Sequence, residues 1–141
     1  MTAPRWKEIE ANVDLAEIEK IRDFLEELLR KMNCVEEDSV KLKLAFHEIL
    51  INILNHVYLN KSGPIKVRFW SEEDVFYIEV RDQGKAFNPA EVPPLDLEQK
   101  INSGTAGGFG IYLIKTLMDG YSYKRDGIEN VLTIFKRIHL H

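Results

Sequence analysis

The sequence predicts an α/β (α+β) two-layer sandwich, in which helices cover one face of a mixed, mainly antiparallel sheet. Apolar residues recur every three to four positions through residues 15–32, which is typical of an amphipathic helix. In residues 65–70 and 76–82 apolar and polar residues alternate instead, which is typical of half-buried strands. The length of 141 residues predicts a single domain that spans residues 1–141.

The first half of the chain is predicted to contain a strand followed by two helices. Residues 6–13 alternate weakly and form the first strand. Asp14 opens a capping pattern for the first helix, which ends near Asn33. The acidic residues 36–38 begin the second helix, because the helix dipole favours negative charge there. This helix ends before the breaker residues 62–64.

The second half is predicted to complete the sheet and to contain one long connection. Side chains alternate along a strand, so Asp82 lies on the apolar side of the strand that it ends. Residues 83–107 are rich in Gly, Pro, Asn and Ser, and a connection of this length is often a lid. A short helix follows at residues 111–119. Residues 121–138 form a terminal hairpin, whose loop through Asp126-Gly127 is longer than the two-residue minimum.

Composition and charge exclude several classes of protein. The net charge of −4 argues against wholesale binding to nucleic acid or to an anionic membrane. The single cysteine, Cys34, has no partner for a disulfide or a cysteine metal site. No apolar run reaches the length of a membrane span, and the N-terminus has no signal-like apolar stretch. A cytoplasmic protein is therefore expected.

One helix combines a largely apolar surface with a single polar stripe. If residues 44–58 are an α-helix, Glu48, Asn52, Asn55 and His56 fall within about 100° of one another. Burying a carboxylate and two amides is costly unless they find partners. The stripe therefore either meets other buried polar groups or faces a wet, functional cavity.

Three stretches together have the parts needed to bind ATP. Asp82 can accept a hydrogen bond from the adenine amino group, and Gly84 lets the backbone approach the base. Gly107, Gly108 and Gly110 would expose the N–H groups of a helix N-terminus to the phosphates. On the polar stripe, Asn52 offers an amide oxygen to Mg²⁺, and Glu48 can accept the proton of an attacking hydroxyl.

The same stretches resemble the N, G1 and G2 boxes of the GHKL (Bergerat-fold) ATPase and kinase superfamily. The match is best to its anti-sigma factor serine/threonine-protein kinases, which have a histidine kinase-like ATPase domain. Their pattern is met by Glu48-x3-Asn52-x3-His56-x-Tyr58, by Asp82-x-Gly84 and by residues 108–114. The resemblance spans residues 6–138 with the elements in family order. Two positions differ: Ala86 replaces a second glycine, and Glu129-Asn130-Val131 replaces a Gly-Thr pair before the last strand.

The resemblance implies a Bergerat fold with ATP bound between the helices and a lid at about residues 86–107. It implies Glu48 as the catalytic base, Asn52 as the Mg²⁺ ligand and Lys100 as a γ-phosphate contact. The full set of ATP-binding residues that it implies is Asn52, Asn55, His56, Asp82, Gly84, Ala86, Phe87, Lys100, Gly107, Gly108, Phe109, Gly110 and Ile111.

The resemblance also implies a function and partners. The protein would be a Mg·ATP-dependent serine kinase that sequesters a sigma factor and phosphorylates an anti-anti-sigma (STAS-type) partner, as a homodimer. Two alternatives stay open: a nucleotide-gated binding module without kinase activity, and a partner-activated kinase of a stress complex that does not bind sigma.

Other nucleotide motifs do not account for the sequence. Residues 108–113 lack the third glycine of a dinucleotide fingerprint, and no phosphate-binding P-loop occurs. His47 faces away from the polar stripe and is interpreted as a structural histidine.

Overall fold

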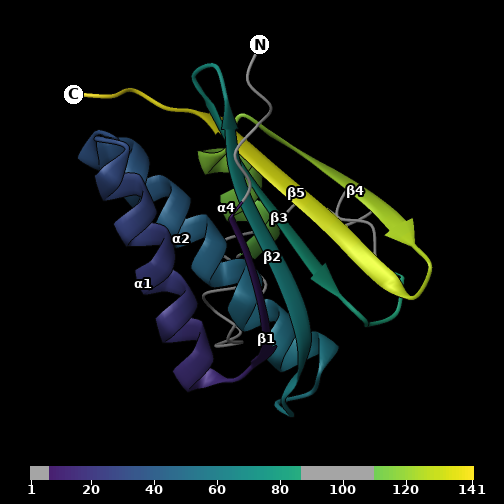
Figure 1. The fold of residues 1–141 in the computed structure, drawn as a ribbon. Helices are drawn as coiled ribbons and strands as arrows, with labels where there is room; N and C mark the ends of the chain where they lie inside the picture. The colour runs from purple at the N-terminus through teal and green to yellow at the C-terminus, as the bar shows by residue number, and fades with distance from the viewer. Residues whose placement is uncertain (1–6, 87–109) are drawn as a thin grey trace, which may run out of the picture.

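The structure is a computed structural model that describes residues 7–86 and 110–141. The predicted strands and helices are present in the expected order, with their ends shifted by a few residues (Figure 1). The elements are β1 (Lys7–Val13), α1 (Leu15–Lys31), α2 (Glu36–Asn52), η1 (Ile53–Val57), β2 (Gly63–Glu72), β3 (Val75–Asp82), α4 (Gly110–Leu117), β4 (Gly120–Asp126) and β5 (Glu129–Arg137). The predicted lid lies outside the described residues, apart from Ala86.

The five strands form one sheet in the order β1-β2-β3-β5-β4. All four strand pairs are antiparallel, so the predicted antiparallel majority extends to every pair that is described. Val67, Val80 and Leu132 lie in one row across the three central strands. The sheet therefore brings β3 and β5 together although α4 and β4 lie between them in the chain.

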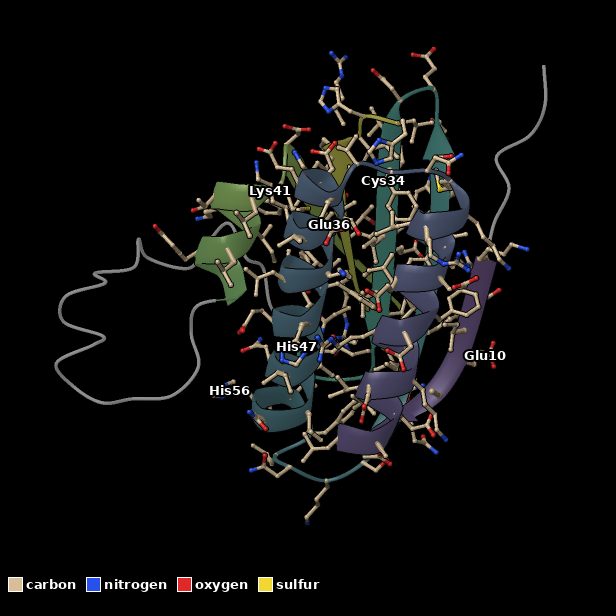
Figure 2. All side chains as sticks on the ribbon, turned by 90° about the vertical axis from the view of Figure 1, so that its left-hand side faces the viewer. Glu10, Cys34, Glu36, Lys41, His47 and His56 are labelled. Carbon is tan, nitrogen blue, oxygen red and sulfur yellow. The ribbon has the colours of Figure 1, made fainter. Side chains whose placement is uncertain are left out.

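The helices cover one face of this sheet, as predicted. The turned view shows α1, α2 and α4 in front of the strands (Figure 2). The core lies between the two layers, where Phe46 of α2 meets Phe69 of β2 edge to face, with ring centroids 5.5 Å apart. Within residues 7–86 and 110–141, no helix is long and apolar enough to cross a membrane. Fully buried side chains of this core include Val13, Ile21, Leu25, Leu29, Leu42, Phe46, Leu50, Val67, Phe69, Phe76, Ile78, Ile114 and Ile134.

The ends of the first helix and of the terminal hairpin show how local sequence fixes the elements. The Asp14 side chain accepts a hydrogen bond from the Glu17 N–H at 2.8 Å, which confirms the predicted cap of α1. The prediction of a long hairpin loop was wrong, because only Gly127 and Ile128 join β4 to β5. Gly127 has φ +61°, which glycine adopts without a steric penalty.

The second helix departs from regular α-helical geometry at its end. α2 stops at Asn52, and Ile53–Val57 form a π turn. The Tyr58 N–H bonds the Ile53 carbonyl, five residues back, at 3.0 Å. A continuous α-helix to Tyr58 was predicted, so the stripe drawn with 3.6 residues per turn is not kept beyond Asn52. π turns of this kind occur frequently at functional sites.

A cluster of charged side chains connects β3 to β4 near the C-terminal end of β3. The Glu79 carboxylate accepts a hydrogen bond from Arg81 at 2.8 Å, and Arg81 also reaches Asp126 of β4 at 3.0 Å. Hydrogen bonding to Glu79, followed by that to Asp126, raises the pKa of Arg81 in spite of its burial. Arg81 thus connects the end of β3 to the β4–β5 hairpin.

The C-terminal residues fold back onto the connection between α1 and α2. The Val35 N–H bonds the His139 carbonyl, and the His141 N–H bonds the Asn33 carbonyl, both at 2.8 Å. The buried Asp38 carboxylate contacts the His139 backbone N–H at 2.7 Å and the His139 ring Nδ1 at 2.9 Å. Asp38 therefore joins the start of α2 to the end of the sheet layer.

Candidate functional site

Two side chains of the polar stripe of α2 have no protein partner within residues 7–86 and 110–141. Glu48 and Asn52 are half-buried, and each neighbours a fully packed apolar position, Ile49 and Ile53. Neither side chain makes a hydrogen bond or an ion pair with any residue in the part of the chain that is described. Between the two readings of the stripe, this geometry favours the one in which it faces a functional cavity.

The π turn brings the end of this helix against the end of β3. Tyr58 follows the π turn, and its hydroxyl accepts a hydrogen bond from the Gln83 N–H at 2.9 Å. The same hydroxyl donates to the Pro64 carbonyl of β2 at 2.6 Å. Burial raises the pKa of Tyr58, so the hydroxyl keeps the proton that it donates. Tyr58 thus joins the polar helix, β2 and the turn after β3.

Two glycines make this close packing possible. A Cβ on Gly84 would lie 2.3 Å from a methyl group of Val57, and a Cβ on Gly63 would lie 2.5 Å from the ring of Tyr58. Neither glycine has a left-handed φ, so each is needed for space and not for backbone conformation. Besides the open approach to a ligand that the sequence predicts for Gly84, the contact with Val57 is therefore a second reason for a glycine at this position.

The two carboxylate oxygens of Asp82 differ in their hydrogen bonds to the described residues. It is 8% exposed, and its Oδ1 accepts hydrogen bonds from the Gly84 N–H at 2.8 Å and from the Asn130 side chain at 3.0 Å. Among the described residues nothing hydrogen-bonds Oδ2. Oδ2 can therefore accept a hydrogen bond from the amino group of a ligand.

The β4–β5 hairpin contributes residues that sequence reasoning did not assign to the site. Asn130 lies directly opposite Asp82 in the sheet and is 5% exposed. Arg125 donates from Nη1 to the Gly84 carbonyl at 2.6 Å. The sequence marked Asn130 only as a departure from the family pattern, because the pairing of β3 with β5 was needed to place it beside Asp82.

The glycine-rich stretch is described only from its last residues. Gly110 is the first residue of α4, and Ile111 is the second. Ile114 of α4 and Met118, which follows α4, are buried in the core shared with α2. Ala86 is exposed. The other predicted contacts of this stretch lie outside the described residues: Phe87, Lys100, Gly107, Gly108 and Phe109.

Three further polar residues belong to α2 and η1. Asn55 lines a hollow of about 500 Å³ together with Asp14 at the start of α1, and His56 is exposed in η1 (Figure 2). His47 lies on the side of α2 that faces α1. Burial, followed by the charge of Arg22, lowers the pKa of His47, and its Nδ1 has no partner among the described residues. A neutral, enclosed imidazole fits the structural role that was predicted.

A five-stranded antiparallel sheet with helices on one face is the architecture of a histidine kinase-like ATPase domain. The model of the family described as "Histidine kinase-like ATPase domain" matches residues 11–136. The chain belongs to the histidine kinase-like ATPase family.

The curated relatives narrow the class further. The chain is 36% identical over 122 residues to the serine-protein kinase RsbW of Bacillus licheniformis, a match that covers 82% of this chain and 76% of the relative. It is 32% identical over 116 residues to the RsbW of Bacillus mycoides, with 79% and 72% covered. With relatives of this name matched over most of both chains, the protein is a serine-protein kinase that uses ATP.

Solved structures show the same fold at low sequence identity. The RsbU and RsbW domains of a Mycobacterium tuberculosis protein match with a TM-score of 0.67 and 16% identity, covering 95% of this chain and 32% of that one. The SiaB–SiaC complex of Pseudomonas aeruginosa matches with a TM-score of 0.65 and 14% identity, covering 93% and 89%. These similarities confirm the α+β sandwich with helices on one face.

Proposed function

We propose that this serine-protein kinase is an anti-sigma factor that phosphorylates a small anti-anti-sigma protein of the STAS type. The unphosphorylated partner would compete with the sigma factor for the kinase, and phosphorylation would end that competition. The observation that carries the proposal is the buried Asp82 beside the Gly84 turn, whose Oδ2 accepts no hydrogen bond from residues 7–86 and 110–141, in a chain with RsbW relatives.

Asp82 and Gly84 form the adenine side of the proposed site. The carboxylate accepts the exocyclic amino group of adenine on Oδ2, while Oδ1 stays bonded to the protein. The backbone at Gly84 has no Cβ to obstruct the base. Tyr58 holds the Gln83 N–H and so fixes the turn on which the base would lie.

Asn52 and Glu48 form the phosphate side. Asn52 supplies a neutral oxygen to Mg²⁺, which would neutralise charge on the phosphates. No group of three His, Cys, Asp or Glu side chains gathers as a metal site in residues 7–86 and 110–141. A single amide oxygen, that of Asn52, suits a Mg²⁺ ion that takes most of its other oxygen ligands from phosphates and water.

Glu48 is proposed to act as the general base. A serine hydroxyl is a poor nucleophile at neutral pH, and a carboxylate within hydrogen-bond reach accepts its proton as the phosphorus–oxygen bond forms. Glu48 has no ion pair among the described residues that would occupy its oxygens. A partly exposed, unpaired carboxylate on a rigid helix has the properties that this task requires.

The substitution Glu48→Gln tests the mechanism, because it keeps size and hydrogen bonding but removes the basic oxygen. Single-turnover phosphorylation of a panel of STAS-type proteins should fall about 10²–10⁴-fold, with ADP affinity and melting temperature retained. Glu37→Gln, on the exposed face of the same helix, is the matched control and should leave the rate unchanged.

Three results would revise the proposal. An unchanged rate in Glu48→Gln would remove Glu48 from the mechanism. A joint loss of melting temperature and ADP affinity would make it a structural acid. If the wild type bound ADP but phosphorylated no partner, a nucleotide-gated binding module would be favoured.

The partners are tested separately. Co-purification with a sigma factor in the presence of ADP, and its release by the unphosphorylated STAS-type protein, is the expected behaviour. Sedimentation of the chain alone should give the mass of a homodimer. A sigma factor that never co-purifies would favour a partner-activated kinase of another complex.

A further inference from the structure

Asn130 occupies a buried position where β5 meets the end of β3. It pairs with Asp82 in β3 and with Arg125 in β4. Its Nδ2 donates to Asp82 Oδ1 at 3.0 Å and to the Lys85 carbonyl at 2.7 Å. Its Oδ1 accepts from the Tyr123 hydroxyl at 2.6 Å and from Arg125 Nη1 at 3.2 Å. One amide thus connects the residue that would bind adenine to the turn that follows it.

The chemistry of the neighbours fixes which way this amide points. The carboxylate of Asp82 and the carbonyl of Lys85 can only accept hydrogen bonds, whereas the guanidinium of Arg125 can only donate them. A flipped amide would place its oxygen against two acceptors and its NH₂ against a cation. The orientation found in the structure is therefore strongly preferred.

This orientation determines what Asp82 can offer a ligand. Because Nδ2 of Asn130 and the N–H of Gly84 both donate to Oδ1, they hold the carboxylate in one rotamer. Oδ2 is then left to accept a hydrogen bond from a ligand. An acceptor at this position binds the amino group of adenine and repels the carbonyl oxygen that guanine has at the same place.

We propose that Asn130 is a specificity-determining positioning residue, which makes the site selective for adenine over guanine by holding Asp82 as a pure acceptor. Arg125 assists by fixing both the Asn130 oxygen and the Gly84 carbonyl. This inference rests on the proposed assignment of Asp82 to the adenine, and it adds a residue from the opposite strand to that assignment.

A purely structural role for Asn130 makes a different prediction. An amide that only stabilised the β3–β5 pairing would affect all nucleotides equally when it is removed. Selectivity between ADP and GDP therefore separates the two roles, and neither nucleotide requires turnover to be measured.

The test compares ADP and GDP binding by calorimetry in the whole chain and in three variants. Asn130→Ala removes both donors and should weaken ADP binding about tenfold (about 1.4 kcal/mol) while GDP binding changes little. Asn130→Asp places a second carboxylate beside Asp82, so the pair should share a proton and the preference for ADP should shrink further. Asn130→Thr keeps one hydroxyl donor and should lie between the wild type and Asn130→Ala.

Asn12→Ala and Asn12→Asp are the controls, because Asn12 is an exposed residue of the edge strand β1. They should leave the ADP to GDP ratio unchanged. Melting temperatures of all variants show whether each is folded, and the conservative Asn130→Thr provides the measurement if the others do not fold.

Each outcome distinguishes a specificity-determining role of Asn130 from a purely structural one. A narrowed ADP to GDP ratio in the Asn130 variants, with the controls unchanged, supports the proposal. Equal losses for the two nucleotides, or no loss, would overturn it. A wild type that binds ADP and GDP equally would also overturn it and leave nucleotide binding intact. A wild type that binds neither would overturn the nucleotide site itself.

Discussion

Replacing Gly84 by Ala should destabilise the protein through one identifiable contact. The added Cβ would lie 2.3 Å from a Val57 methyl group, whereas carbon atoms in favourable contact are about 3.5–4.0 Å apart. Val57 cannot easily rotate away, because a β-branched side chain is stiff at χ1. Overpacking of this size costs about 1–3 kcal/mol of unfolding free energy.

The same contact predicts a rescue. In Val57→Ala the offending methyl is absent, and the nearest atom of residue 57 would be its Cβ, at 3.5 Å. The Asp82 Oδ1 remains at 3.0 Å, so the rescue should be partial. The loss of unfolding free energy in the double variant should therefore be smaller than the sum of the two single losses by about 1–2 kcal/mol.

Urea unfolding of the four proteins, followed by circular dichroism, measures this coupling. Gly127→Ala is the matched control, because Gly127 has φ +61° and an added Cβ would meet no atom within 4 Å. It should lose stability through backbone conformation alone and show no coupling to Val57→Ala. Additive losses for Gly84→Ala and Val57→Ala, within about 0.5 kcal/mol, would refute the steric argument.

Two further substitutions test the contacts that hold the layers together. Tyr58→Phe removes the hydroxyl that accepts the hydrogen bond from the Gln83 N–H. Calorimetry should therefore show weaker ADP binding, and urea unfolding should show a loss of about 1 kcal/mol in unfolding free energy. Unchanged values would contradict the role of Tyr58 in holding the turn after β3. Burial raises the pKa of Asp38, but hydrogen bonds from His139 and the charge of Lys136 outweigh it and lower that pKa below the ordinary 3.8. Asp38 therefore contributes stability above pH 3.8 that is lost as the pH falls through its folded-state pKa. Asp38→Asn should cost about 1–3 kcal/mol at pH 6 and progressively less below pH 4, and a loss independent of pH would contradict this.

The elements were predictable because their residues report directly on local geometry. The cap at Asp14 and the alternation through β2 and β3 depend on neighbours a few residues apart. The same alternation placed Asp82 on the buried side of its strand, and the structure agrees. Local patterns were therefore sufficient to predict the two layers and the buried position of Asp82.

The contacts that shape the site were not predictable in the same way. The π turn at Ile53–Val57 has no signature in apolar periodicity, because the chain there is apolar on several sides. The fit of Val57 against Gly84 and the bond from Asn130 to Asp82 join residues far apart in sequence. Such contacts depend on strand register and on side-chain volume, which single-sequence patterns do not encode.

The pairing of β3 with β5 also bears on how the chain tolerates changes of length. Asp82 and Asn130 are 48 residues apart, so forming this pair closes a long loop in the folding chain. The entropic cost of closure grows only with the logarithm of loop length, by about 0.6 kcal/mol for each doubling. By loop-closure entropy alone, a change in the number of residues between Asp82 and Asn130 should therefore alter stability little. The length of that connection is then free to be set by selection for catalysis and partner recognition, and not by the demands of folding.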